Sequence, residues 1–310
     1  MKRKLTIAIS IVSLVLIFCT YVSLNNREGI KVSPLEIPGN GESDDFDKTN
    51  LKVKSNITFD ETASVYKFKQ SKADENFVKN VAKTFNIDIN KKIDDTGDNL
   101  IIEDNNGRLL VEKATSMWSY ERKLNEQAKS TDKIVISDDS RVIEIAKREL
   151  AKYKLSTSSF FKPIVSYKTE TVAGETDSKI LAKDIYFYKS FNGKPVIGTS
   201  RIIVSIGNND EILSISKYYR EVEETAYKVK LKKRDDMLNE IKNNKTLALY
   251  NGKDKIPGNI EITSVELCYW EDSSNGFLQP VYVMKGSDTK NVSYVFSAYV
   301  PAVVKNQTVK

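Results

Sequence analysis

The sequence predicts an α+β protein in which an N-terminal transmembrane helix precedes about three small modules, each an antiparallel sheet with one helix. Three observations support this prediction. An uncharged apolar run lies near the N-terminus, apolar residues recur at helical spacing in three segments, and strand-forming residues surround an Asn-Gly pair after each segment. The composition, 40% hydrophobic and 29% charged, is usual for a folded chain and too apolar for a disordered one.

The N-terminus has the pattern of a membrane anchor. Residues 1–4 form a basic tail, and residues 5–24 carry no charge. About 20 apolar residues are enough to span the hydrocarbon core of a bilayer, and the positive-inside rule keeps the basic tail in the cytoplasm. We therefore expect a single-pass protein of the cell membrane, with a linker at residues 25–50 and the bulk of the chain outside the cytoplasm. A cleaved signal peptide or a lipidated Cys19 is the alternative, but the run is long and lacks an A-x-A-like cleavage site.

Hydroxyl side chains recur along one face of this expected helix. They are Thr6, Ser10, Ser13 and Thr20. Small and hydroxylated residues let two helices approach closely in lipid and form hydrogen bonds between them. The four residues are therefore a candidate partner-binding face. The alternative is that each hydroxyl bonds the backbone carbonyl four residues earlier in its own helix.

Three segments with apolar residues at helical spacing predict one helix for each module. Ser137 or Asp138 can cap the second helix, which we expect to cover one face of the sheet that follows it. The segments are residues 73–85, 137–153 and 231–244, in modules that we place at residues 51–130, 131–225 and 226–310.

The Asn-Gly pairs predict tight turns, because both residues tolerate the positive φ angles that a two-residue hairpin needs. They begin at residues 106, 192 and 275, a spacing of about 85 residues that indicates three related modules. Chance is the alternative, because Asn is abundant. Around the second pair, alternation places Ile185 and Phe187 on one sheet face, and Tyr186 and Tyr188 on the other.

The region from residue 137 to residue 302 resembles the PepSY/FTP-type modules of bacterial peptidase propeptides and cell-wall regulators. The residues that match are Tyr188, Asn192, Gly193, Pro195, Val196, Gly198 and Ile212. The following reversal departs from that pattern, because it has Asn-Asn-Asp at residues 208–210 where a Gly is commoner. With its expected anchor, the chain is also similar to YycH/YycI-type proteins. That likeness implies a regulator that restrains a histidine kinase.

The residues for common catalytic sites are missing or misplaced. The chain has no His, which removes the usual general base and the commonest zinc ligand. S-x-x-K matches such as Ser130/Lys133 and Ser214/Lys217 lack the companion motifs of acylating enzymes. We expect Cys268 to be a buried structural thiol.

The carboxylates and the overall charge do not indicate a sugar, calcium or nucleic-acid site either. Glu271 and Asp272 follow Trp270, but adjacent strand residues point to opposite sides, so we expect a loop entrance rather than a glycosidase pair. The acidic residues within 42–47 lack the glycine of a calcium loop. The net charge of +6 falls to a near balance beyond residue 4, which argues against nucleic-acid binding. We expect no cofactor and no metal.

Together these expectations predict a non-enzymatic, membrane-anchored protein that acts outside the cytoplasm as a regulator or inhibitor. Its partner would be a protein such as a sensor histidine kinase in cell-envelope signalling. The abundance of Lys, Asn and Ile points to a low-GC, Firmicutes-like bacterium. The alternative is an accessory or propeptide-like module that controls a peptidase or cell-wall hydrolase. A structural envelope protein is a third class.

Overall fold

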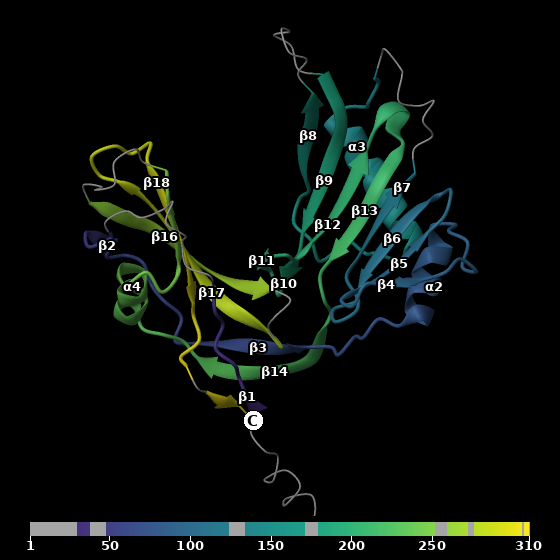
Figure 1. Cartoon of the computed structure of the whole chain (residues 1–310). Coiled ribbons are helices and arrows are strands. Elements are labelled where there is room, and N and C mark those ends of the chain that lie inside the picture. The colour runs from purple at the N-terminus through teal and green to yellow at the C-terminus, as the bar shows by residue number, and fades with distance from the viewer. Residues whose placement is uncertain are drawn as a thin grey trace, which may run out of the picture.

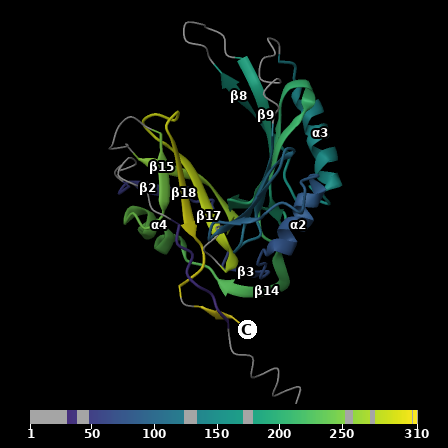
Figure 2. The same ribbon diagram turned by 45° about the vertical axis from the view of Figure 1, so that its right-hand side comes forward.

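The computed structural model describes residues 30–37, 48–123, 134–170, 179–251, 259–271, 276–305 and 307–309. Within these residues the chain forms two large sheets that splay apart like the arms of a V, with the helices on their outer sides (Figures 1 and 2). We call the eight-stranded sheet with its two helices the first lobe, and the nine-stranded sheet with its single helix the second lobe.

The first lobe is an antiparallel sheet with the helices α2 (Glu75–Thr84) and α3 (Asp139–Lys152) on one face. The residues of α3 that the helical spacing places toward the sheet, Val142, Ile145, Ala146 and Leu150, are all buried in one core with residues of the sheet. In spatial order the strands are β4 (Asp94–Asp95), β5 (Asn99–Glu103), β6 (Gly107–Glu112), β7 (Trp118–Arg122), β13 (Ile212–Tyr218), β12 (Arg201–Ile206), β9 (Lys179–Tyr188) and β8 (Ile164–Glu170). The short 3-10 helix η3 (Asn208–Asp210) joins β12 to β13.

The second lobe buries Met237 and Ile241 of α4 (Arg234–Lys242) against its nine-stranded sheet. Its central strands are β16 (Ile260–Glu271), β17 (Phe277–Asp288), β18 (Val295–Pro301) and β15 (Leu247–Tyr250). The others are β2 (Leu51–Val53), β3 (Thr62–Phe68), β14 (Val222–Lys230), β10 (Ser190–Phe191) and β11 (Lys194–Gly198). A separate two-stranded sheet pairs β1 (Ile30–Lys31) with β19 (Thr308–Val309).

The hairpin β10–β11 leaves the first lobe between β9 and β12 and joins the second lobe, where β11 pairs in parallel with β16. Its turn has positive φ at Asn192 and Gly193, 49° and 73°, as the Asn-Gly pair predicts. Gly198, at φ 96°, ends β11 beside the backbone of Glu271, where a Cβ atom would overlap the Glu271 carbonyl oxygen.

A buried polar network, which we call the junction network, fixes this crossing. The Glu271 carboxylate is 1% exposed and accepts hydrogen bonds from the Ser200 hydroxyl and, at 2.8 Å, from the Arg220 backbone N–H. The Arg220 side chain lies 3.4 Å from the same carboxylate and stacks on the Phe68 ring at 3.6 Å. Phe68 ends β3, Ser200 precedes β12, and Arg220 lies between β13 and β14. The network therefore joins three of the four places where the chain passes between lobes within the described residues.

The fold class predicted from sequence is wrong. The structure is 49% strand and 15% helix, with two large sheets instead of three small modules. Pairing of β7 with β13 joins strands of the first and second expected modules into one sheet. Strands β2 and β3 pair with β16 and β17 of the second lobe. These pairings link residues far apart in sequence, whereas helical spacing and turn chemistry report only local structure.

The expected N-terminal transmembrane helix also needs correction, and with it the description of a single-pass membrane protein. No helix within the described residues is long and apolar enough to cross a membrane. The expected span at residues 5–24, with Thr6, Ser10, Ser13 and Thr20, lies outside the described residues. Part of the expected linker is ordered, since Leu35 and Ile37 are buried against the second lobe.

Candidate functional site

Large apolar side chains gather at one free edge of the first lobe. Strand β8 ends the order of the eight-stranded sheet, and only β9 pairs with it in the described part of the chain. Six of the twelve large apolar side chains that are exposed in the described residues lie on or beside these two strands. They are Phe161, Ile164, Tyr167, Ile180, Leu181 and Tyr188, which we call the edge surface.

The edge surface wraps around both faces of the β8–β9 pair. Ile164, which is 57% exposed, lies opposite Tyr186 in the pairing register, and the next pair is Val165 with the buried Ile185. Because side chains alternate along a strand, Ile164 and Tyr186 point away from the helices. The rings of Tyr186 and Tyr188 stack there at 6.1 Å. The alternation predicted for this segment is therefore confirmed.

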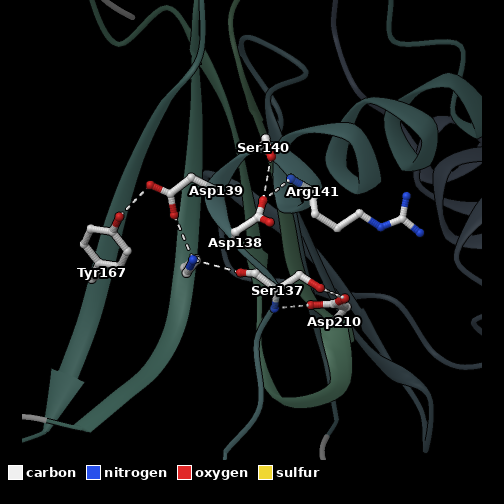
Figure 3. Close-up of polar contacts among 8 residues, drawn as sticks. Ser137, Asp138, Asp139, Ser140, Arg141, Tyr167 and Asp210 are labelled. Atoms are coloured by element: carbon white, nitrogen blue, oxygen red, sulfur yellow. Dashed lines mark hydrogen bonds and ion pairs between the residues drawn. The ribbon is translucent and has the colours of Figure 1, made fainter.

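A polar cluster on the other face fastens β8 and β9 to the start of α3 (Figure 3). The Asp139 carboxylate accepts hydrogen bonds from the Tyr167 hydroxyl of β8 at 2.6 Å and from the Lys183 ammonium of β9 at 2.8 Å. The Lys183 ammonium also donates to the Ser137 backbone oxygen at 2.8 Å. We call these contacts the Asp139 clamp.

The clamp perturbs the two groups that meet at its exposed side. The hydrogen bonds from Lys183 and then from Tyr167 hold the pKa of Asp139 below its ordinary value. The hydrogen bond to Asp139 raises the pKa of Tyr167. The Asp139 carboxyl is therefore charged and the Tyr167 hydroxyl is protonated near neutral pH, the states in which both hydrogen bonds form.

Two further contacts fix the start of α3. The Asp138 side chain accepts from the Arg141 backbone N–H at 2.9 Å, so Asp138 is the residue that caps the helix. The Ser137 backbone N–H and hydroxyl both donate to Asp210 of η3, at 2.8 and 2.5 Å. The helix, the β12–β13 connection and the β8–β9 pair are thus held as one unit behind the edge surface. Such an arrangement suits rigid presentation of apolar side chains to a partner.

The structure separates most residues that the sequence suggested for chemistry. Lys217 lies opposite Trp118 on the face of β13 that carries the helices, and Ser214 lies opposite Glu121 on the other face, so the pair cannot act together. Cys268 is buried as expected, and burial raises the pKa of its thiol to about 12. Ser130, Lys133 and Asp272 lie outside the described residues.

Glu271 is the last residue of β16, at the start of the connection to β17, and its carboxylate is buried in the junction network. The residues of the edge surface on β8 were not singled out from sequence. The sequence signal that was present is the mixture of apolar and polar residues from Pro163 to Glu170, which reads as a strand but does not show that the strand lies at an edge.

Comparisons with known proteins give a likeness among solved structures alone. No family model matches the chain, and no curated protein matches it. Among solved structures, the chain is similar to the C-terminal domain of YpeB from Bacillus megaterium, with 11% sequence identity and a TM-score of 0.32. The match covers 77% of this chain and 98% of that domain. The PepSY-like and YycH/YycI-type resemblances both stay predictions from the sequence.

Proposed function

We propose that the chain is a non-enzymatic regulatory protein that acts outside the cytoplasm by binding a partner protein through the edge surface. The observation that supports the proposal most is the concentration of exposed apolar side chains at the free edge of the eight-stranded sheet. Contiguous exposed apolar groups commonly mark interaction sites on soluble domains.

The edge offers two kinds of contact to a partner. The outer side of β8 presents backbone groups that an extended segment can pair with, which is the basis of recognition by strand addition. The apolar side chains on both faces of the edge add contact area, and aromatic residues such as Tyr167 and Tyr188 are enriched in protein interfaces. A sensor histidine kinase is the partner class that we favour.

A photoreactive residue placed at Ile164 of the full-length chain tests this proposal in cells. We expect a discrete crosslinked product with one partner protein, and no equivalent product from the same residue at Val292, which is 78% exposed in the second lobe. Equal products at both positions, or none at Ile164, would contradict the proposal. Mass spectrometry of the product separates the partner classes, since a peptidase or wall hydrolase would favour the propeptide-like alternative.

A matched pair of charge substitutions shows whether binding depends on the edge surface. Leu181, in β9, and Leu249, in β15 of the second lobe, are 37% and 39% exposed. We expect Leu181→Asp to remove the crosslink from position 164, and Leu249→Asp to leave it unchanged.

A further inference from the structure

A cavity of about 540 Å³ lies on the helix side of the first lobe, beside the junction network. Its volume is within the range of about 300–1,000 Å³ that small-ligand pockets occupy. Side chains from α2, from β7 and from the end of α3 make its apolar wall. They are Phe77, Val81, Trp118, Tyr153 and Leu155.

Four charged side chains also line the cavity, and three of them are cations. Arg220 pairs with Glu271 and stacks on Phe68, so its charge serves the junction network. The other charged residues that line the cavity are two cations, Lys69 and Lys217, and one anion, Glu221. The cavity therefore combines an apolar wall with a surplus of one positive charge.

Lys217 occupies the position where a charged ligand group would meet the apolar wall. It lies opposite Trp118 in the pairing of β13 with β7, so both side chains project from one face. Its ammonium donates to the Tyr219 backbone oxygen at 2.8 Å and lies 4.0 Å from the centre of the Tyr219 ring. An ammonium has three donors, and this carbonyl occupies one of them.

We propose that the cavity binds a ligand whose apolar chain or ring ends in a single carboxylate, with the carboxylate paired to Lys217. The apolar part contacts Trp118 and its neighbours in the wall. Two sources share this chemistry, the C-terminal residue of a peptide and a short fatty acid. The cavity is separate from the edge surface, so the proposal stands or fails independently of the proposed function.

Tryptophan fluorescence of the full-length chain can test the proposal directly. The chain has two tryptophans, and Trp270→Phe leaves Trp118 as the reporter inside the cavity. The probes are N-acetyl-Ala-Leu with a free carboxylate, the same peptide as its amide, and octanoate. We expect a saturable change with at least one carboxylate, and binding of the amide weaker by about tenfold or more, because a charge-assisted hydrogen bond is lost.

The two carboxylate probes distinguish the sources, since binding of only the peptide or only octanoate assigns the ligand to that class. Equal binding of the acid and the amide, or no saturation with any probe, would overturn the proposal.

Charge-removing variants locate the carboxylate. We expect Lys217→Met to weaken binding of the carboxylate by about tenfold, and Lys147→Met, which removes an exposed ammonium on α3, to leave it unchanged. Unchanged binding by folded Lys217→Met would overturn the pairing. If Lys217→Met does not fold, Lys69→Gln at the exposed rim serves instead, and its affinity should fall several-fold. Unchanged affinity of Lys69→Gln would then count against the proposal.

Discussion

At the scale of single residues, Lys217 brings a titratable group into an apolar surrounding. Burial lowers its pKa to about 8, an effect that Lys189 reinforces and that Glu221 and Glu271 oppose. Burial lowers the pKa of Lys189 as well. The folded chain thus releases protons from this region at a lower pH than the unfolded chain does.

This difference predicts how the stability depends on pH. Between about pH 8 and pH 10.5 the unfolded chain keeps a proton on Lys217 that the folded chain has released, so the contribution of Lys217 to the free energy of unfolding rises with pH in this range. Burial raises the pKa of the nearby Tyr153 and Tyr219, which reverses the trend above about pH 10. The Cys268 thiol ionises in the unfolded chain near pH 9, whereas burial raises its pKa to about 12 in the folded chain, so this thiol opposes the lysine contribution. Denaturant titrations from about pH 7.5 to 9.5 therefore isolate Lys217 by comparison with a variant that lacks it.

The control is the same series on Lys217→Met. Its free energy of unfolding should rise less steeply with pH than that of the wild type, because the contribution of Lys217 is then absent. Parallel pH profiles for the two proteins would show that Lys217 does not titrate in this range.

Single residues also show why the candidate site could be predicted only in part. Alternation in residues 185–188 separates Ile185 and Phe187 from Tyr186 and Tyr188, and the structure confirms it, because the first two are buried and the others are not. Whether Ile164 is exposed depends on β8 lying at an edge, and no local pattern encodes this. The Glu271 carboxylate meets Ser200 through the pairing of β11 with β16, two strands that are distant in sequence.

At the scale of elements, the junction depends on the close approach of β11 to β16. Gly198→Ala should weaken it strongly, because the added Cβ would overlap the Glu271 carbonyl oxygen at a residue with φ of 96°. Gly193→Ala is the matched control, since Gly193 also has positive φ but nothing lies within 4 Å of its added Cβ. We expect the control to lose about 1 kcal/mol of stability from backbone strain.

For Gly198→Ala we expect a larger loss, by a further ~1–3 kcal/mol, from forced overlap. Equal unfolding free energies for the two variants in urea titrations would contradict the close approach that the structure shows.

The start of α3 gives a second prediction at this scale. Asp138→Ala removes the acceptor that caps the Arg141 N–H, so the midpoint of thermal unfolding should fall. Asp138→Asn keeps a neutral acceptor but removes the charge, so its midpoint should lie between those of Asp138→Ala and the wild type. Hydrogen bonds from Ser140 and Arg141 lower the pKa of Asp138, so its contribution is present above the ordinary pKa of 3.8 and is lost as the pH falls below it.

The contribution of the cap is checked by repeating the thermal scans at acidic pH. There the difference between Asp138→Ala and the wild type should shrink. A difference that stays constant down to acidic pH would mean that the charged carboxylate is not what stabilises the helix.

The helices and strands also show which features could be predicted from the sequence and which could not. All three predicted helices are present, because an apolar period of 3.6 residues is a local signal, as is the capping Asp that α2 and α3 have. The turn at Asn192-Gly193 is present for the same reason. Strand partners that come from distant segments were not predicted. The pairing of β3 with β14 and β17 is an example, because a strand pattern specifies a buried face but not the neighbour.

At the scale of the whole molecule, the two lobes have separate cores and one shared buried network. Truncating Glu271 to Ala leaves the Arg220 guanidinium, whose side chain is 10% exposed, without the carboxylate it now pairs with. Breaking a buried pair in this way costs about 3–5 kcal/mol. The three chain passages that meet at the network then lose their common contact, so the lobes should become less coupled.

Calorimetry of the full-length chain measures this coupling. We expect one cooperative transition for the wild type and two resolved transitions for Glu271→Ala, because each lobe keeps its own core but loses the contact that makes them unfold together. Glu266→Ala is the control, since Glu266 is exposed on the same strand and its loss should change stability by no more than about 0.5 kcal/mol. A single transition for Glu271→Ala at the wild-type temperature would show that the strand pairing of β11 with β16 couples the lobes without help from the buried carboxylate.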